Sequence, residues 1–256
     1  MLVRGLTMLV GLPLLILVVG VGGIWLRGIL FVLSLIGLNE FYRAFSGAKI
    51  LPIHVVGYLF VAVYFFALDM PLVVFAAFIL ANIFAVVVFY HKFDVKECLV
   101  TIGGFFYVPF LLSFIYFVRN DSIYFVWLIF TSASASDTFA YLIGRKWGNH
   151  KMTGTSSPGK SWEGCIAGVV GAAAIGYAYA VIAVNLEFDL SVLNAVIISV
   201  AGAVFSQFGD LFASAIKRSV GIKDFGKVLP GHGGILDRFD GIMVSAAMVY
   251  MVMILL

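Results

Sequence analysis

The residues of this chain best suited to chemistry gather between Ser214 and Asp240, in the segment SAIKRSVGIKDFGKVLPGHGGILDRFD. Cations and backbone N–H groups bind phosphate oxygens, and glycines let the backbone approach those oxygens closely. Carboxylates in the same place would repel a phosphate unless a divalent cation lay between them, and Mg²⁺ is usually held by one or two carboxylates plus substrate phosphates. The mixed signs therefore predict a site for a metal–nucleotide complex. The segment alternates cations (Lys217, Arg218, Lys223, Lys227, Arg238) with glycines (Gly221, Gly226, Gly231, Gly233, Gly234) and acids (Asp224, Asp237, Asp240).

Two further carboxylates lie inside apolar stretches: Asp137 in TSASASDTFAYLIG and Asp210 in SQFGDLFASAIKR. An Asp at the centre of a membrane helix costs about 2.5–3.5 kcal/mol on insertion scales, so such residues normally face a polar cavity and mark function. For Asp137 alone, a structural pairing with a Lys or a helix N-terminus is the alternative. Helical spacing predicts two polar stripes, one of Ser206, Asp210, Ser214 and Lys217, the other of Ser134, Asp137 and Tyr141. If the last helix has begun by Asp237, then Asp237 and Asp240 share one side of it.

The elements that position these residues are expected to be membrane helices. Hydrophobic residues make up 63% of the 256, charged residues only 11%, and the mean hydropathy is +1.12. Soluble domains have about 45–50% apolar and about 25% charged residues, so lipid must solvate this excess. A spanning helix needs about 20 mostly apolar residues. We predict an all-α polytopic membrane bundle of about nine transmembrane helices, near residues 6–26, 28–45, 53–69, 71–90, 99–118, 123–143, 163–185, 191–216 and 239–256.

The basic residues predict the orientation of this bundle. With a cytoplasmic N-terminus and nine alternating spans, fourteen of the sixteen Lys and Arg lie on the cytoplasmic side, and only Arg27 and Arg119 lie opposite. This distribution obeys the positive-inside rule. The long polar connections near 144–162 and 217–238 are then both cytoplasmic. We expect N-terminal transmembrane helices over 1–120, a catalytic region over 121–256, and chemistry that faces the cytoplasm.

The segment from Ser214 to Asp240 closely resembles the signature of the phosphatidate cytidylyltransferase (CDP-diacylglycerol synthase) family. That signature is S-x-hydrophobic-K-R, four residues, K-D, a turn, H-G-G and D-R-x-D. It is filled here by Ser214, Lys217, Arg218, Lys223, Asp224, His232, Gly233, Gly234, Asp237, Arg238 and Asp240. Upstream, SSPGKSWEG and the D-x-x-A-Y-x-x-G run from Asp137 to Gly144 also fit, although Gly159 stands where the family commonly has a second basic residue. The resemblance covers about residues 130–240.

The resemblance implies an integral enzyme of the bacterial inner membrane. Such an enzyme transfers CMP from CTP to phosphatidic acid and releases pyrophosphate. It also implies Mg²⁺ held by Asp210 and Asp237, and a homodimer. Asp137 and Asp240 are candidates for a further cation or for orienting a Lys or Arg. Phosphate and nucleotide contacts are assigned to Lys160, Lys217, Arg218, Lys223, Lys227, Gly233, Gly234 and Arg238, whereas His232 either binds phosphate or holds the turn.

Three other functions fit parts of the pattern. An ether-lipid phosphate could replace phosphatidic acid, because lipid tails are recognised only by apolar surface. A CTP-dependent lipid kinase would release CDP, and the signature fits it less well. An organic phosphate transporter should show broken helices or inverted repeats with a midplane site, whereas here the polar residues crowd one face. The net charge of +3 is too small to indicate nucleic acid, and Cys98 and Cys165 are expected to be plain small hydrophobes.

Overall fold

The computed structural model describes residues 13–152, 159–188, 190–228 and 233–256. Within these residues every regular element is a helix, and one isolated bridge joins Lys151 to Ser161. Seven helices of this part of the chain are long and apolar enough to cross a membrane, with Val95–Asp121 taken as one span. The predicted all-α polytopic membrane bundle is therefore confirmed.

The observed helices follow most of the predicted spans closely. In chain order the described elements are α2 (Gly23–Gly47), α3 (His54–Phe66), α4 (Pro71–Val88), α5 (Val95–Phe105), η1 (Phe106–Phe110), α6 (Leu111–Asp121), α7 (Ile123–Trp147), α8 (Trp162–Asn185), α9 (Val192–Ser219) and α10 (Leu236–Leu255). Side-chain caps fix several starts, because they satisfy N–H groups that have no partner within the helix. Ser122 accepts a hydrogen bond from Phe125 N (3.3 Å), and Ser161 accepts one from Gly164 N (3.2 Å).

The predicted boundary between the first two spans, at Arg27, is wrong. Residues 13–21 are helical, and the chain breaks at Gly22 and Gly23, whose φ angles are 69° and 53°. Glycine adopts positive φ without the steric penalty of a Cβ atom, so the turn forms there. Arg27 consequently lies inside α2, and not in a connection. Residues 6–12 of the first predicted span lie outside the described residues.

The third predicted span, residues 53–69, is also shorter than expected. Its helix α3 has 13 residues, and the chain leaves the helix at Ala67. Thirteen residues rise only about 20 Å, against about 30 Å for the hydrocarbon core. Apolar composition continued past the point where the helix ends, so the sequence alone overestimated its length.

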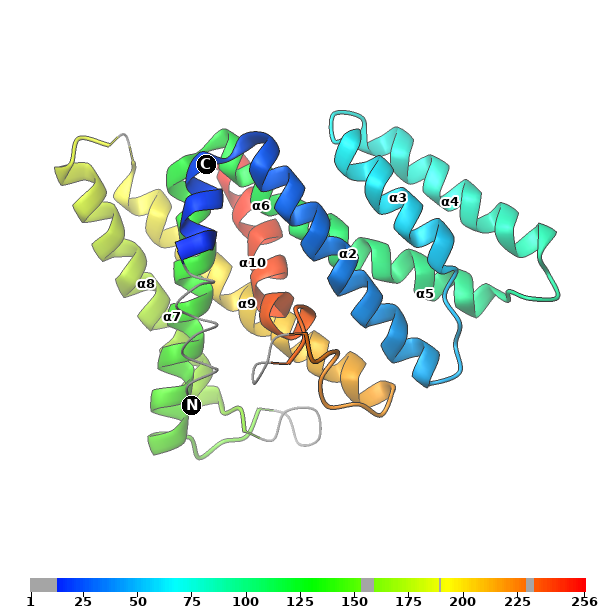
Figure 1. Ribbon diagram of the computed structural model, residues 1–256. Helices are drawn as coiled ribbons and strands as arrows, with labels where there is room; N and C mark the ends of the chain where they lie inside the picture. Colours follow the sequence, from blue (N-terminus) through cyan, green and yellow to red (C-terminus); the bar gives the residue numbers. More distant parts are fainter. Residues whose placement is uncertain (1–12, 153–158, 189, 229–232) are drawn as a thin grey trace. The chain divides into compact units, whose positions relative to one another are not determined.

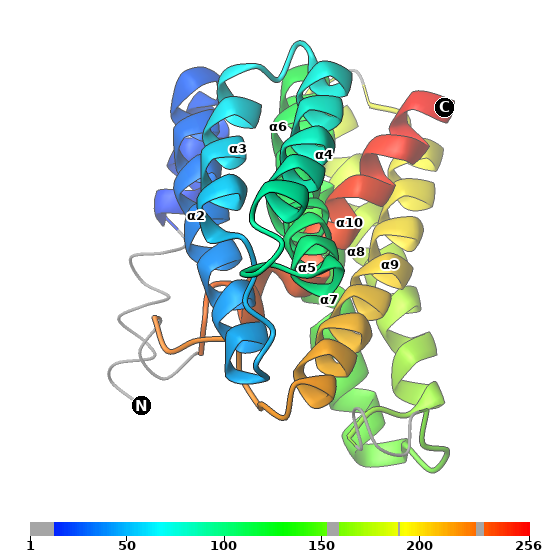
Figure 2. The same cartoon turned by 90° about the vertical axis from the view of Figure 1, so that its right-hand side faces the viewer.

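The chain divides into two compact units. The first unit comprises residues 1–113 and 219–237; among its described residues α2, α3 and α4 run side by side (Figure 2), and α5 packs against all three. Two hydrogen bonds to Thr101 of α5 link separate segments of this unit. The Tyr42 hydroxyl donates to Thr101 O (3.0 Å), and Ile53 N donates to Thr101 Oγ1 (2.7 Å). Gly104 leaves room for the Tyr42 ring, because a Cβ there would lie 2.8 Å from Tyr42 Cε1.

The second unit comprises residues 114–218 and 238–256, in which α7 and α8 lie against each other (Figure 1). Small residues allow this approach. A Cβ added to Gly164 would lie 2.8 Å from Ala140 O and 3.1 Å from Gly144 Cα. A Cβ on Gly168 would lie 2.8 Å from Ser136 O. Such contacts between small residues are the usual means by which helices associate in lipid, where apolar surface gives no net driving force.

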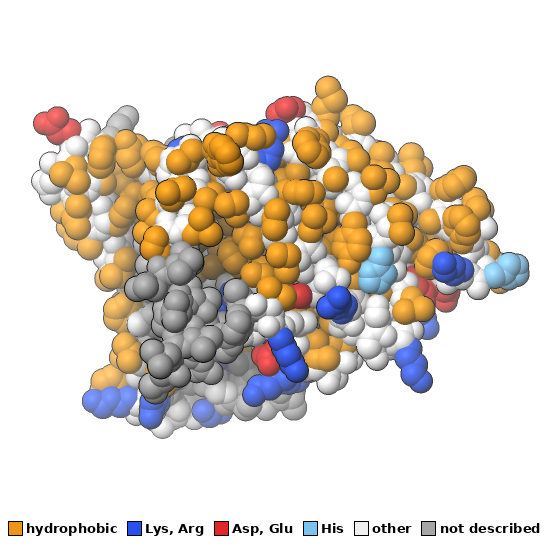
Figure 3. Space-filling model, in the orientation of Figure 1, with side chains coloured by type: hydrophobic (Ala, Val, Ile, Leu, Met, Phe, Trp, Pro, Cys, Tyr) orange, Lys and Arg blue, Asp and Glu red, His pale blue; other side chains and the backbone are white. Residues whose placement is uncertain are grey.

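Large apolar side chains cover the sides of the helices. Phe66 and Leu72 are each 80% exposed, and Figure 3 shows hydrophobic side chains over the helix surfaces, with Lys and Arg near helix ends. A soluble protein would not leave such continuous apolar surface in water. The exposed surface of both units therefore suits a lipid environment.

Candidate active site

The acidic and basic residues of the second unit gather where α7, α9 and the start of α8 meet. Lys160, which lies just before α8, places its Nζ 2.5 Å from Asp210 Oδ2 on α9. Asp137 on α7 is attracted electrostatically by Lys160 and Arg238 and repelled by Asp210. The helix α9 is continuous from Val192 to Ser219, so the predicted stripe through Asp210 is a true helical face. Two carboxylates and two cations from separate segments of the chain thus form one cluster.

In the first unit, Asp237 organises the glycine-rich connection. Its Oδ2 accepts hydrogen bonds from Phe225 N (2.9 Å) and Gly234 N (3.0 Å). Gly233 has a φ of 89°, which a side chain would strain. The helix α10 begins at Leu236, so Asp237 already lies in its first turn. Asp237 and Asp240 are therefore three residues apart on one helix and share a side of it, as predicted for a helix that has begun by Asp237.

Glu40, on α2, is a site residue that the sequence reasoning missed. The residue is only 3% exposed. Its Oε1 accepts a hydrogen bond from Ile235 N (3.1 Å), and its Oε2 accepts one from Leu236 N (2.8 Å). These N–H groups belong to the start of α10, where an anionic acceptor is favoured by both hydrogen bonding and the helix dipole. Gly234 packs against the same carboxylate, since a Cβ there would lie 2.5 Å from Glu40 Oε2. The rule that singled out Asp137, a carboxylate inside an apolar span, would also have found Glu40.

Close contact between α9 and α10 positions the carboxylates of the second unit. A Cβ added to Gly209 would lie 2.5 Å from Asp240 O, and one added to Gly241 would lie 2.7 Å from Ser206 Oγ. Asp240 is buried, and its Oδ1 accepts Gly241 N (2.8 Å). The two glycines therefore bring the backbones together beside Asp210 and Asp240.

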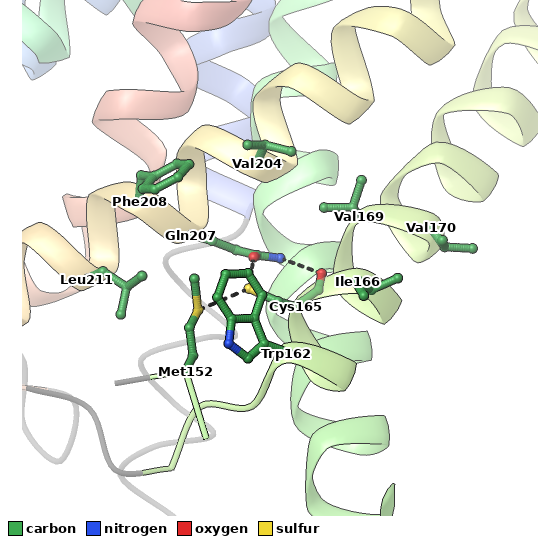
Figure 4. Close-up of a pocket in the computed structure, with 10 residues that line it drawn as sticks. All are labelled: Met152, Trp162, Cys165, Ile166, Val169, Val170, Val204, Gln207, Phe208 and Leu211. Atoms are coloured by element: carbon green, nitrogen blue, oxygen red, sulfur yellow. Dashed lines mark hydrogen bonds between the residues drawn. The ribbon is translucent and has the colours of Figure 1, made fainter. Parts of the chain in front are cut away.

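Gln207 ties three helices together one turn before Asp210. Its Nε2 donates to Ser136 Oγ of α7 (2.9 Å) and to Cys165 O of α8 (3.0 Å). The thiol of Cys165 in turn donates to Gln207 Oε1 (Figure 4). Cys98 is buried and free, as a small hydrophobe would be, but Cys165 also makes a hydrogen bond, which the sequence did not indicate.

The other predicted residues occupy the ends of these elements. His232 lies outside the described residues, so neither of its two suggested roles is addressed. Lys217 and Arg218 belong to the last turn of α9, Lys223, Lys227, Gly233 and Gly234 lie in the connection before α10, and Arg238 lies in the first turn of α10.

The donor set suits a hard cation completed by substrate. Among the described residues, no group of three or more His, Cys, Asp and Glu side chains forms a metal cage. The second unit instead brings Asp137 and Asp210 close enough to repel each other. Such carboxylate pairs are favourable when a cation lies between them, and Mg²⁺ prefers oxygen ligands shared with phosphates. Asp210 and its neighbours therefore fit the magnesium that the sequence predicts.

Comparison with known proteins gives several relatives. The phosphatidate cytidylyltransferases of Staphylococcus haemolyticus and Staphylococcus saprophyticus are each 35% identical over 150 residues, covering 59% of this chain and 55% of theirs. That of Thermotoga maritima is 39% identical over 150 residues, covering 57% and 55%. The chain thus spans about half the length of the curated relatives it matches. The profile of the cytidylyltransferase family matches residues 2–256, and the chain therefore belongs to the cytidylyltransferase family.

Proposed function

We propose that this chain is a phosphatidate cytidylyltransferase, which transfers CMP from CTP to phosphatidic acid and yields CDP-diacylglycerol and pyrophosphate. The observation that carries the proposal is the cluster of Lys160, Asp210, Asp137 and Arg238, which combines phosphate-binding cations with carboxylates at one place. The family membership and the names of the relatives support it.

The reaction needs little covalent help from the protein. A phosphate oxygen of phosphatidic acid attacks the α-phosphorus of CTP, and the bond from that phosphorus to the bridging oxygen of pyrophosphate breaks. The nucleophile is already anionic, because the second pKa of a phosphomonoester is about 6. No general base is required, and the protein's task is to align two polyanions and to balance their charge.

The candidate site residues have distinct parts in this task. Lys160 and Arg238 would bind phosphate oxygens. Asp210 and Asp237 are the carboxylates assigned to Mg²⁺, and Asp137 and Asp240 are candidates for a second cation or for orienting a Lys or Arg. Magnesium bound there would screen nucleophile from leaving group and stabilise the charge on departing pyrophosphate. The hydrogen bonds that Phe225 N and Gly234 N donate to Asp237 orient that carboxylate.

The basic asymmetry of the sequence supports an active site at the cytoplasmic face of a bacterial inner membrane. CTP is charged and cytoplasmic, whereas phosphatidic acid keeps its tails in the bilayer. A site at the headgroup level of that face serves both substrates. Homodimerisation stays a prediction.

The proposal is tested with purified full-length protein, CTP labelled in the cytidine, phosphatidic acid and Mg²⁺, with products separated by thin-layer chromatography. We expect a labelled CDP-lipid and pyrophosphate, both abolished by chelation of Mg²⁺. The variant Asp237→Asn keeps an oxygen acceptor for the N–H groups of Phe225 and Gly234 but removes the charge. Its turnover should fall at least about 100-fold while the protein stays folded.

Other products would redirect the proposal. Labelled CDP without pyrophosphate would indicate a CTP-dependent lipid kinase. Turnover of an ether-lipid phosphate in preference to phosphatidic acid would change the lipid and keep the reaction. No turnover of either lipid, by protein shown to be folded, would overturn the enzyme assignment and leave transport as the next candidate.

A further inference from the structure

An apolar groove runs between α8 and α9 in the second unit (Figure 4). One wall carries Ile166 and Val170, which are spaced by one helical turn, and the other carries Val204 and Phe208 at the same spacing. The groove therefore runs along the helices, as the i, i+4 rows do. Its volume is about 300 Å³.

The groove opens toward the surface that suits lipid. Ile166 is 63% exposed, Val170 is 62% exposed and Phe208 is 54% exposed. The polar atoms of its floor are already satisfied, because the Gln207 amide is held by Ser136 and Cys165. A ligand of this groove must therefore be apolar along its whole length.

One end of the groove meets the charged cluster. Trp162 lines the groove two residues after Lys160, and Gln207 lies three residues before Asp210, a rise of about 4.5 Å along α9. Lys160 and Asp210 are themselves in contact. An apolar channel that ends at a phosphate-binding cation complements an amphiphile with one charged end.

We propose that this groove holds part of one acyl chain of the lipid phosphate substrate, with its phosphate at the Lys160 end. The inference rests on the proposed function and names the surface that receives the lipid tail. A volume of about 300 Å³ lies at the lower limit of ligand pockets, which suits a chain segment. A helix of a second protein would need a contact of about 1,000 Å² or more, far beyond this narrow channel.

The groove acts by positioning the lipid. A lipid tail that leaves the bilayer for an apolar groove gains no hydrophobic free energy, because both environments are equally apolar. What the groove can add is a fixed path for the chain, which places the phosphate for attack. Misplacement by about 1 Å can cost about 100-fold in rate, so a groove of this kind improves turnover more than affinity.

The first test maps lipid contacts on the full chain in lipid nanodiscs. The probe is a phosphatidic acid with a diazirine midway along one acyl chain, and its crosslinks are located by mass spectrometry. We expect crosslinks in residues 162–170 and 204–211, suppressed by unlabelled phosphatidic acid. Phosphatidylcholine with the same diazirine chain should label these segments weakly. Equal labelling by both lipids would mean ordinary bilayer contact and overturn the proposal, as would crosslinks located only elsewhere.

The second test narrows the groove with Ile166→Trp. The matched control is Ile182→Trp, because Ile182 lies on the same helix, is 61% exposed and does not line the groove. We expect the ratio of kcat/KM for long-chain to short-chain phosphatidic acid to fall about tenfold in Ile166→Trp. Ile182→Trp should leave this ratio at the wild-type value. An unchanged ratio in both variants would contradict the proposal.

The two tests separate the failure of the groove from the failure of the proposed function. Wild-type protein without any CDP-lipid product would overturn the reaction, yet the crosslinks could still be scored. Wild-type protein with full activity and no crosslink in either segment would keep the reaction and reject the groove.

Discussion

For Lys160, a role in phosphate binding can be distinguished from a role in the stability of the protein. Its ion pair with Asp210 is partly solvated, since the two side chains are 25% and 37% exposed. Exposed pairs of this kind contribute only about 0–1 kcal/mol to stability. Stability therefore does not explain why a lysine is placed there, whereas the proposed role in holding phosphate beside Asp210, the proposed metal ligand, would explain it.

The variant Lys160→Met is expected to lower kcat/KM for CTP about 100-fold, because it removes a cation next to the developing charge. Its melting temperature should stay within about 4 °C of wild type, the shift that about 1 kcal/mol produces in a protein of this size. Lys151→Met is the control, since Lys151 is an exposed lysine of the same connection and joins Ser161 only through the backbone bridge. A large loss of stability with little loss of activity in Lys160→Met would assign the residue a structural role.

Single residues were predictable where their type is unusual for their surroundings. Asp137 and Asp210 stand out because they interrupt apolar runs, and Asp237 because it lies in a segment of mixed charge. Their partners were not predictable, since nothing in the sequence says that Lys160 meets Asp210. Glu40 shows the limit most clearly, because its hydrogen bonds reach residues 195 and 196 positions away.

At the scale of elements, Glu40 links α2 to the start of α10 within the first unit. A carboxylate that accepts two N–H groups at a helix start contributes charge-assisted hydrogen bonds of about 1.5–3 kcal/mol each in favourable cases. It also fixes the connection in which Asp237 is held by Phe225 and Gly234. The helix α2 thus helps to position Asp237, the carboxylate that we propose holds Mg²⁺.

The variant Glu40→Gln should lower both the melting temperature and kcat, the latter about tenfold, because the start of α10 loses its anionic acceptor. Glu97→Gln is the matched control: Glu97 Oε2 accepts Asp94 N (2.9 Å) in an exposed capping box of α5. That change should cost about 1 kcal/mol or less and leave kcat unaltered. Equal effects of the two substitutions on activity would reject the positioning role of Glu40.

The crossing of α9 and α10 depends on Gly209. Its Cα faces the backbone of Asp240 so closely that a methyl group would lie 2.5 Å from the carbonyl oxygen. Backbone cannot move aside as a flexible side chain does, so Gly209→Ala must push the helices apart. We expect an activity loss of about 100-fold, because Asp210 is the next residue.

Gly103→Ala is the control for Gly209→Ala. It lies in α5 with nothing within 4 Å of an added Cβ, and it should stabilise the protein by about 1 kcal/mol through helix propensity. Activity and thermal unfolding are measured for both variants, so that a loss of activity caused by the helix crossing is distinguished from a general loss of stability. Full activity in Gly209→Ala would show that the crossing tolerates a wider spacing.

At the scale of the whole chain, composition and span length predicted the class of fold and most helix bounds. The predicted spans 163–185 and 71–90 differ from α8 and α4 by at most two residues at either end. The errors fell where backbone geometry decides the outcome, at the positive-φ break of Gly22 and at the early end of α3. Which glycines face one another across a helix contact could not be predicted from the sequence, because that pairing depends on the packing.

The orientation of the chain in the membrane can be tested on the two ends of α4. Its 18 residues rise about 27 Å, close to the thickness of the hydrocarbon core, so Asp69 and Lys92 should lie on opposite sides. The basic asymmetry predicts that Lys92 lies on the cytoplasmic side. In a variant whose two native cysteines are replaced by serine, we introduce Asp69→Cys or Lys92→Cys and label intact cells with a membrane-impermeant maleimide. Asp69→Cys should react in intact cells, and Lys92→Cys only after the membranes are opened. The reverse pattern would place the carboxylates and cations on the side that CTP does not reach, and the proposed cytidylyltransferase reaction could not operate in that orientation.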